Sequence, residues 1–337
     1  MALRFTLVET IPLLEAEALE ITMLVDNTID ALLAPEEGVR RKPWLTVANP
    51  ILEGGVGRAT LTAEHGFAAL ITVRARGRSH QLLFDAGVSP TGLIDNMDRL
   101  QLEAKDLEAV VLSHGHFDHT GGLDGLAKRL GRSGMPLMAH RKAFTKRRSA
   151  VVGTSPETPP IAMPTLSRSA LEGTGFEFTD SDDPSLLFHD ALLLTGEVPR
   201  VSFEPGMPPS HQHLTDAGWE HDALVADDQA MVVNVRGRGL VILTGCGHAG
   251  IVNIVTRAKE ITGVDKVHAV LGGFHLPGAF YEPYIAATVK ALQDFNPDTI
   301  VPAHCTGYQA QCALQTAMPA AFVQNAVGTT FSFEGLS

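Results

Sequence analysis

Residues 112–122 of the chain read LSHGHFDHTGG, and they carry three histidines and one aspartate between positions 114 and 119. The apolar run at 107–113 that leads into them is typical of a buried strand. His114 and His116 are two residues apart, so their side chains point the same way in extended backbone. Asp118 and His119 follow where the chain turns toward a helix. Two hypotheses fit this stretch: a histidine-rich surface loop, or half of a metal site.

Three other histidines also follow apolar runs that we predict to be strands. His248 comes after the run at 239–245, His275 follows the run at 266–273, and His304 closes the run at 298–304. Ligand sites in layered α/β folds form at the carboxyl ends of strands, so side chains from distant positions converge there. Four strands that each end in a histidine therefore favour the metal site. Imidazole and carboxylate ligands together suit Zn, Fe or Mn.

Short apolar runs and helical patterns alternate over much of the chain. We predict strands at 19–27, 67–75, 80–87, 107–113, 136–140, 229–235, 239–245, 266–273 and 298–304, and helices at 90–100, 121–131, 250–262 and 283–295. This order favours an α/β fold in which two mixed sheets form a sandwich with helices outside. Residues 150–228 are rich in Pro and Gly, with strand-like pieces at 176–180 and 191–198. We interpret 150–228 as a loop-rich insertion or cap within a single domain, 1–337.

The composition limits the classes of partner. The formal net charge is −12, from 26 basic and 38 acidic residues, so a nucleic-acid partner is disfavoured. The chain shows no secretory signal and no uninterrupted apolar stretch of about 18 to 20 residues. These features predict a cytoplasmic protein without a membrane partner. The three cysteines do not make a disulfide framework, and the sequence does not indicate the oligomeric state.

A basic segment at 140–149 has two interpretations. It is either the solvated face of a helix or a local anchor for one small anionic group. In the second case, the side chains that could contact a substrate anion are Arg141, Lys142, Lys146 and Arg147.

The stretch HGHFDH at 114–119 resembles the His-x-His-x-Asp-His signature of the metallo-β-lactamase superfamily. The apolar run before it, TGGL after it, LFDAG at 83–87 and VPAH at 301–304 fit the same family. The resemblance implies an αββα sandwich with a dinuclear metal site at one edge. Residues 227–253, 271–276 and 301–307 further resemble the subgroup of dihydropterin-type ribofuranosylaminobenzene phosphate synthases.

The resemblance also implies ligand roles. His114 and His116 would bind a first metal ion, and Asp118, His119 and His304 would bind a second. Most hydrolases of the superfamily place a third histidine before a hairpin strand and a bridging aspartate after the next strand.

This chain departs from that pattern, because no histidine precedes the hairpin and Cys246 stands at the expected aspartate position. We therefore expect His248 to serve as the third histidine. Cys246 is either a soft metal ligand or, as we favour, a small residue buried under the site. Asp227 or Asp228 could reach the metals from the start of the hairpin, and of the two we favour Asp227.

Other side chains near the motifs are expected to support the site. Asp85 would hold a ligand imidazole in one tautomer. His275 could bind metal, hydrogen-bond the substrate or protonate a leaving group, or it could be a turn residue capped by backbone. We assign catalytic roles to Asp118 and His275. Cys305 and Thr306 are expected to pack beside His304.

Three functions agree with these features. The first is a hydrolase in which two divalent metal ions supply hydroxide for attack on a small ester, phosphoester or lactone. We expect the ions to be Zn, with Mn or Fe as alternatives. The second is a synthase of the dihydropterin type, as the subgroup name implies. The third is a redox or sensor protein with a di-iron site in the same ligands. The expected partner is a small-molecule substrate in the first two cases.

Overall fold

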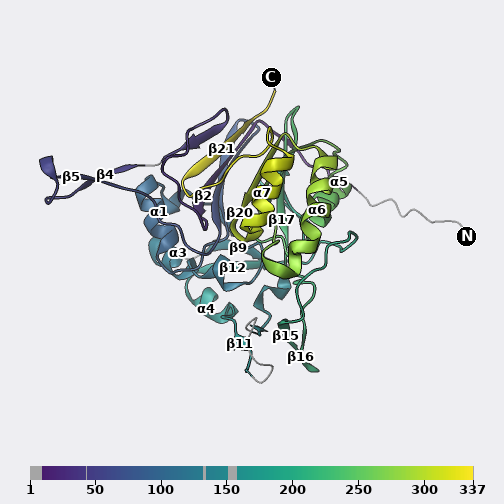
Figure 1. The fold of residues 1–337 in the computed structure, drawn as a ribbon. Helices are drawn as coiled ribbons and strands as arrows, with labels where there is room; N and C mark the ends of the chain where they lie inside the picture. Colours follow the sequence, from purple (N-terminus) through teal and green to yellow (C-terminus); the bar gives the residue numbers. More distant parts are fainter. Residues whose placement is uncertain (1–9, 43, 132–133, 151–157, 337) are drawn as a thin grey trace, which may run out of the picture.

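The computed structural model describes residues 10–42, 44–131, 134–150 and 158–336. Two mixed β-sheets face each other, and helices cover their outer faces, with α1 and α3 on one side and α5, α6 and α7 on the other (Figure 1). This arrangement confirms the predicted αββα sandwich.

The first sheet has eight strands in the order β12-β9-β8-β7-β6-β2-β21-β3. β12, β9, β8 and β7 are parallel to one another, and the other neighbours are antiparallel. The strand bounds are β2 (Ala18–Val25), β3 (Val39–Arg41), β6 (Ala68–Ala75), β7 (Arg78–Phe84), β8 (Ala109–Val111), β9 (Met135–Ala139), β12 (Phe176–Asp180) and β21 (Thr329–Glu334). Helices α1 (Gly92–Leu100) and α3 (Leu123–Leu130) pack on its outer face.

The second sheet follows the order β13-β14-β17-β18-β19-β20, and β1 (Glu15–Ala16) pairs with β17. The predicted hairpin is β17–β18, while β18, β19 and β20 run parallel. The strand bounds are β13 (Ser185–Leu187), β14 (Leu192–Leu194), β17 (Ala230–Val235), β18 (Gly239–Thr244), β19 (Val267–Gly273) and β20 (Thr299–Ala303). Its outer helices are α5 (Ile251–Thr262), α6 (Gly278–Phe295) and α7 (Tyr308–Ala317).

Alternate residues of the central strands fill two different layers of the core. In β6, Ile71 and Val73 face the opposite sheet, whereas Leu70 faces the outer helices. In β18, Leu243 points between the sheets and Ile242 points toward α5 and α6. Both sheets are therefore apolar on two faces, and full burial of each such side chain stabilises the fold by about 1.5–3 kcal/mol.

The interpretation of 150–228 as one loop-rich cap is wrong in its middle part. The strand-like pieces at 176–180 and 191–198 form β12 and β14, and β12, β13 and β14 pair within the two large sheets. These strands have three to five residues, which is too short for a period of two to be recognised against the surrounding Pro and Gly. Residues 151–157 lie outside the described residues.

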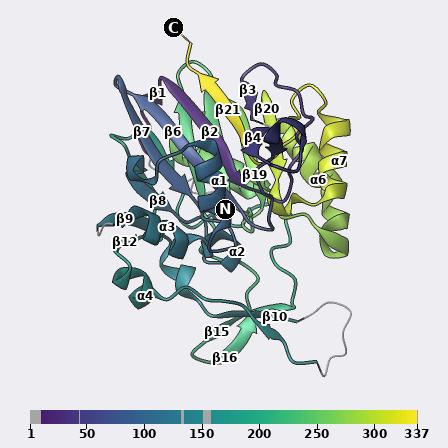
Figure 2. The ribbon, with the colours of Figure 1, turned by 90° about the vertical axis from the view of Figure 1, so that its left-hand side faces the viewer.

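A separate sheet lies below the sandwich in Figures 1 and 2, and we call it the cap sheet. It consists of β10 (Arg147–Ser149), β11 (Ile161–Ala162), β15 (His211–Thr215) and β16 (Gly218–His221), all antiparallel. The short helix α4 (Arg168–Gly173) precedes β12. The cap sheet thus combines three strands of the segment that we expected to be a cap with β10, which directly precedes that segment.

A two-stranded hairpin of β4 (Leu45–Ala48) and β5 (Val56–Ala59) projects from the body of the protein (Figure 1). Trp44 and Ile51 in this hairpin region are 49% and 92% exposed. Among the described residues, no helix combines the length and apolar character needed to cross a membrane.

Candidate metal centre

The predicted ligands meet at one end of the sandwich because they follow strands whose carboxyl ends lie there. His114 and His116 come after β8, and Asp118 and His119 lie in the single turn α2 (Phe117–Thr120). Three further loops deliver the remaining side chains: Cys246 and His248 after β18, His275 after β19, and His304 directly after β20. The two sheets therefore both contribute to the site.

The glycines of the motif allow the backbone to approach its neighbours closely. A Cβ atom at Gly115 would lie 1.8 Å from the Ala143 carbonyl oxygen, and one at Gly121 would lie 1.9 Å from the Val88 carbonyl oxygen. Any larger residue at either position would push the ligand loop away from the sandwich. The motif thus encodes both the ligands and the tight packing that holds them.

Three imidazoles form the first group of ligating atoms. His114 Nε2 is 3.0 Å from His116 Nδ1, which is 3.1 Å from His248 Nε2, and His248 Nε2 is 3.2 Å from His114 Nε2. Nitrogen ligands about 2.0–2.1 Å from a tetrahedral zinc ion are roughly 3.3 Å apart, so this triangle fits one ion. Burial lowers the pKa of all three histidines well below its usual value, which leaves them neutral and able to bind metal at pH 7.

The second group combines oxygen, nitrogen and sulfur atoms. Its members are Asp118, His119, Cys246 and His304, and their ligating atoms lie within 4.8 Å of one another. His304 Nε2 is 3.4 Å from Asp118 Oδ2, and His119 Nε2 is 3.1 Å from Cys246 Sγ. The buried His304 Nε2 has no hydrogen-bond partner among the described residues. A cation is the partner that this donor set suits.

The outward nitrogen of each ligand-type imidazole has its own neighbour. His119 Nδ1 donates to Asp85 Oδ2 at 2.7 Å, so the contact predicted for Asp85 is present. His304 Nδ1 lies 3.1 Å from Asn27 Oδ1, and His114 Nδ1 lies 2.9 Å from Ser113 Oγ. When the outward nitrogen carries the proton, the inward nitrogen is left free to bind metal.

Protonation of His119 differs from that of the other imidazoles. Burial alone would lower its pKa, but the carboxylates of Asp85 and Asp118 outweigh burial and raise the pKa to about 9. Burial would raise the pKa of Asp118, yet His119 and His304 hold it well below its usual value. Metal binding to this group therefore has to displace a proton from His119 at neutral pH.

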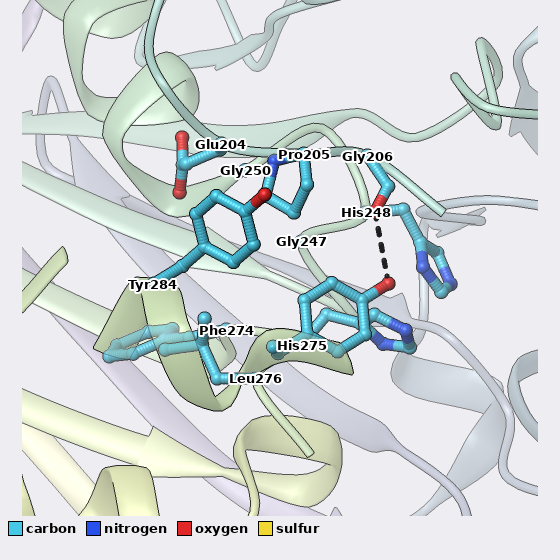
Figure 3. A pocket seen from close by; sticks show the side chains of 11 residues that line it. Glu204, Pro205, Gly206, Gly247, His248, Gly250, Phe274, His275, Leu276 and Tyr284 are labelled. Atoms are coloured by element: carbon cyan, nitrogen blue, oxygen red, sulfur yellow. Dashed lines mark hydrogen bonds between the residues drawn. The ribbon is translucent and has the colours of Figure 1, made fainter. Parts of the chain in front are cut away.

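The ligand groups open into a pocket of about 360 Å³. Its walls include His275 and also Phe117, Met163, Met207 and Pro277. His275 and His248 additionally line a smaller pocket next to it, where their ring centroids are 4.1 Å apart (Figure 3). In that second pocket the Tyr281 hydroxyl donates to the Gly206 carbonyl at 3.1 Å. The two histidines thus form the wall between the two pockets.

A family model of the metallo-beta-lactamase superfamily matches residues 61–218. The chain is 33% identical over 258 residues to a 7,8-dihydropterin-6-methyl-4-(beta-D-ribofuranosyl)-aminobenzene-5'-phosphate synthase of Methanocaldococcus jannaschii, covering 74% of this chain and 83% of the relative. The chain belongs to the metallo-β-lactamase superfamily. An uncharacterized protein of the same organism is 32% identical over 252 residues, covering 74% of this chain and 86% of that protein.

The solved structure of a metal-dependent hydrolase of the same superfamily has the same fold. It aligns with a TM-score of 0.67 and 22% identity over 95% of this chain and 100% of the other.

In this superfamily member, Asp227 supports the ligand loop and lies outside both ligand groups. Its Oδ2 accepts a hydrogen bond from the Gly115 backbone at 2.8 Å, and it forms an ion pair with Arg147. Asp228 lies 4.0 Å from the outward Nδ1 of His114, and burial raises its pKa to about 7. A direct contact of Asp227 with the metals stays a prediction, and the contacts that the structure shows for its carboxylate are with the ligand loop and with Arg147.

The structure also separates the basic segment from the pocket. Arg141 faces Asp182 at 3.8 Å and Lys142 faces Glu197 at 3.5 Å, and Lys146 is exposed. Arg147 is buried between two aspartates. None of these four residues lines the pocket, so the proposed contact with a substrate anion is not supported. Sequence alone could not show that Arg141, Lys142 and Arg147 lie next to acidic side chains.

Two histidines at the site were missed from the sequence. His211 in β15 is 3% exposed, and its Nε2 lies 3.1 Å from His116 Nε2. Burial lowers the pKa of His211 to about 4. His65 stands at the mouth, with its ring 5.2 Å from that of His304. Neither follows a recognisable strand, and the only signal was the repeated histidine in SHQH at 210–213.

Proposed function

We propose that the protein is a hydrolase that uses two divalent metal ions, with Zn expected and Mn or Fe as alternatives. The observation that supports the proposal is the cluster of potential ligands on one pocket, with imidazoles whose outward nitrogens are engaged. Three overlapping groups could hold a metal ion, and the third consists of Cys246, His248 and His275. When bound, such ions lower the pKa of a water molecule toward about 7 and stabilise negative charge on an oxygen.

The chain's own residues would hold and orient the reactants. His114, His116 and His248 would hold one ion, and the group of Asp118, His119, Cys246 and His304 would hold the other. His275 lies in the pocket wall with its buried Nδ1 unpaired among the described residues, so we assign it the proton that a leaving group needs. Asp118 would orient the attacking water from the opposite side.

The pocket volume of about 360 Å³ agrees with a small-molecule substrate. Small esters, phosphoesters and lactones are the proposed classes. No Lys or Arg is among the described residues that line the pocket, so phosphate would have to be bound by the metal ions alone. This favours uncharged esters and lactones within the proposal.

A synthase that acts on pterin and ribofuranosylaminobenzene phosphate is the second candidate. Its support is the 33% identity to the Methanocaldococcus jannaschii synthase. The cationless pocket wall is less suited to a phosphorylated substrate, so we place the hydrolase first.

The test compares metal-free and zinc-loaded protein on panels of lactones, carboxylic esters, phosphodiesters and pterin phosphates. We expect zinc-dependent hydrolysis in the wild type and two metal ions per chain by elemental analysis. His116→Ala and His304→Ala should each lose one ion and hydrolysis while keeping the fold, and the exposed His189→Ala serves as the control. Full metal content in His116→Ala, or conjugate formation without hydrolysis, would overturn the proposal.

A further inference from the structure

A buried arginine joins the cap sheet to the ligand loop. Arg147 in β10 is 4% exposed, and its Nε donates to Asp222 Oδ2 at 2.8 Å. The same guanidinium pairs with Asp227, whose Oδ2 accepts from the Gly115 backbone at 2.8 Å. Gly115 lies between the ligand-type residues His114 and His116. The arginine is therefore connected to the ligand loop through one carboxylate.

A second connection runs from the same arginine to the side chain of His116. The Asp222 backbone donates to the His211 carbonyl at 3.0 Å, and Asp222 Oδ2 lies 4.0 Å from His211 Nδ1. His211 Nε2 in turn lies 3.1 Å from His116 Nε2. We call these residues, Gly115, His116, Arg147, His211, Asp222 and Asp227, the Arg147 ring. They link the cap sheet to the ligand loop by two separate contacts.

The orientation of His116 explains why His211 is needed. The Nδ1 atom of His116 faces the other two imidazoles of the first group, so a neutral, metal-binding His116 must carry its proton on Nε2. The neighbour of that Nε2 is His211 Nε2, which is buried and can only accept when its own proton is on Nδ1. The outward partner of His116 thus lies in β15 of the cap sheet.

We infer that Arg147 and His211 are positioning residues, which use the cap sheet to fix the ring of His116 and the ligand loop for metal binding. The inference rests on the proposed function in one respect: a metal ion occupies the three-histidine group. Arg147 does not line the pocket, and both its aspartate partners are buried, so it acts through them and not on substrate. Loss of such outward partners typically weakens metal affinity by about 10- to 100-fold.

The test measures zinc affinity of metal-free, full-length protein by competition with a chelator, together with thermal unfolding. His211→Leu removes the acceptor for His116. It should weaken the zinc affinity of the three-histidine group by about 10- to 100-fold. His211→Gln places an amide oxygen near the position of Nε2 and should restore most of the affinity. Arg147→Lys keeps the charge but cannot span both carboxylates, and it should resemble His211→Leu.

The matched control lies on the same two strands. Arg148 and Gln212 are neighbours of Arg147 and His211 and form their own hydrogen bond at 2.7 Å. Arg148→Met removes that contact without touching the Arg147 ring, and zinc affinity should stay at the wild-type value. Equal weakening in Arg148→Met would show that general stability of the cap sheet is responsible, which would overturn the inference.

Two further outcomes separate this inference from the proposed function. If the wild type binds zinc and His211→Leu binds it equally well, the inference is wrong while the proposed function stands. If the wild type binds none of zinc, manganese and iron, both are wrong. Should His211→Leu fail to fold, His211→Asn replaces it, because the shorter amide of asparagine does not reach His116. If His211→Asn then binds zinc as tightly as His211→Gln, the inference is contradicted.

Discussion

Each ligand-type histidine of this protein has one nitrogen directed into the site and one held by a neighbour. The neighbours differ in chemistry: a carboxylate for His119, an amide for His304 and a hydroxyl for His114. Because a neutral imidazole carries a single proton, these contacts decide which nitrogen can bind a metal. Residues outside the two ligand groups therefore decide which nitrogen each of these histidines can offer to a metal ion.

Asp85 is the clearest example of such control. Its Oδ1 accepts from the Ser113 backbone at 2.7 Å, and its Oδ2 accepts from Ser113 Oγ and His119 Nδ1. In Asp85→Asn an amide N–H₂ must face one of these donors. We expect about 10- to 100-fold weaker zinc affinity and about 1–3 kcal/mol lower free energy of unfolding. Chelator competition measures the zinc affinity and chemical denaturation measures the free energy of unfolding. Asp95→Asn, at an exposed position, is the control. Unchanged zinc affinity in Asp85→Asn would show that Asp85 does not orient His119.

Cys246 is buried among the potential metal ligands, so both the ligand role and the packing role that we favoured from the sequence stay open to test. Its Sγ lies 3.1 Å from His119 Nε2 and belongs to the second ligand group. We expect cobalt-substituted wild type to show a thiolate-to-metal charge-transfer band in the near ultraviolet, and Cys246→Ser to lose it. Cys312→Ser, outside the site, should keep the band. A band that persists in Cys246→Ser would support the packing interpretation.

At the scale of elements, the ligand loop between β8 and α3 depends on close backbone contacts. Gly121→Ala would place a methyl group 1.9 Å from the Val88 carbonyl oxygen. We expect this substitution to lower the free energy of unfolding by about 1–3 kcal/mol and to reduce metal content. Gly173→Ala, at the end of α4 with nothing within 4 Å of the added atom, should change stability by less than about 0.5 kcal/mol. Equal effects in calorimetry would contradict the packing argument.

The cap sheet shows how short elements acquire structure from partners. Its strands have two to five residues, and none has the length or apolar alternation of an independent strand. The Arg147 ion pairs tie β10 to the loop before β17, which carries Asp227. The ion pairs of the buried Arg147 and the contact of His211 with His116 thus fix the position of the cap sheet.

At the scale of the molecule, the potential metal ligands come from both sheets. His114, His116, Asp118 and His119 follow the first sheet, and Cys246, His248 and His304 follow the second. Bound ions would therefore cross-link the two layers of the sandwich. Several buried polar atoms, His304 Nε2 among them, have no hydrogen-bond partner among the described residues.

Removal of metal should accordingly lower global stability. Zinc at a free concentration about 100 times its dissociation constant adds about 2.7 kcal/mol to the free energy of unfolding. We expect chelation to lower the Tm by roughly 5 °C and zinc to restore it, as measured by calorimetry. A His116→Ala, His304→Ala double variant should show no such response. An unchanged Tm in the wild type would indicate that the ligand groups do not bind zinc.

The sequence by itself determined the superfamily, most of the long strands and helices of the two large sheets, and six of the side chains that meet in the two ligand groups: His114, His116, Asp118, His119, His248 and His304. It could do so because HGHFDH, and the histidines that follow long buried strands, are local patterns that can be recognised from the order of residues alone. Only the tertiary structure decided that Cys246 joins the second group and that Arg147 is bound by aspartates. It also showed that His211, in a short strand of the cap sheet, contacts His116. These outcomes depend on which distant side chains meet in the buried interior, where each carboxylate, cation and imidazole nitrogen must find a partner.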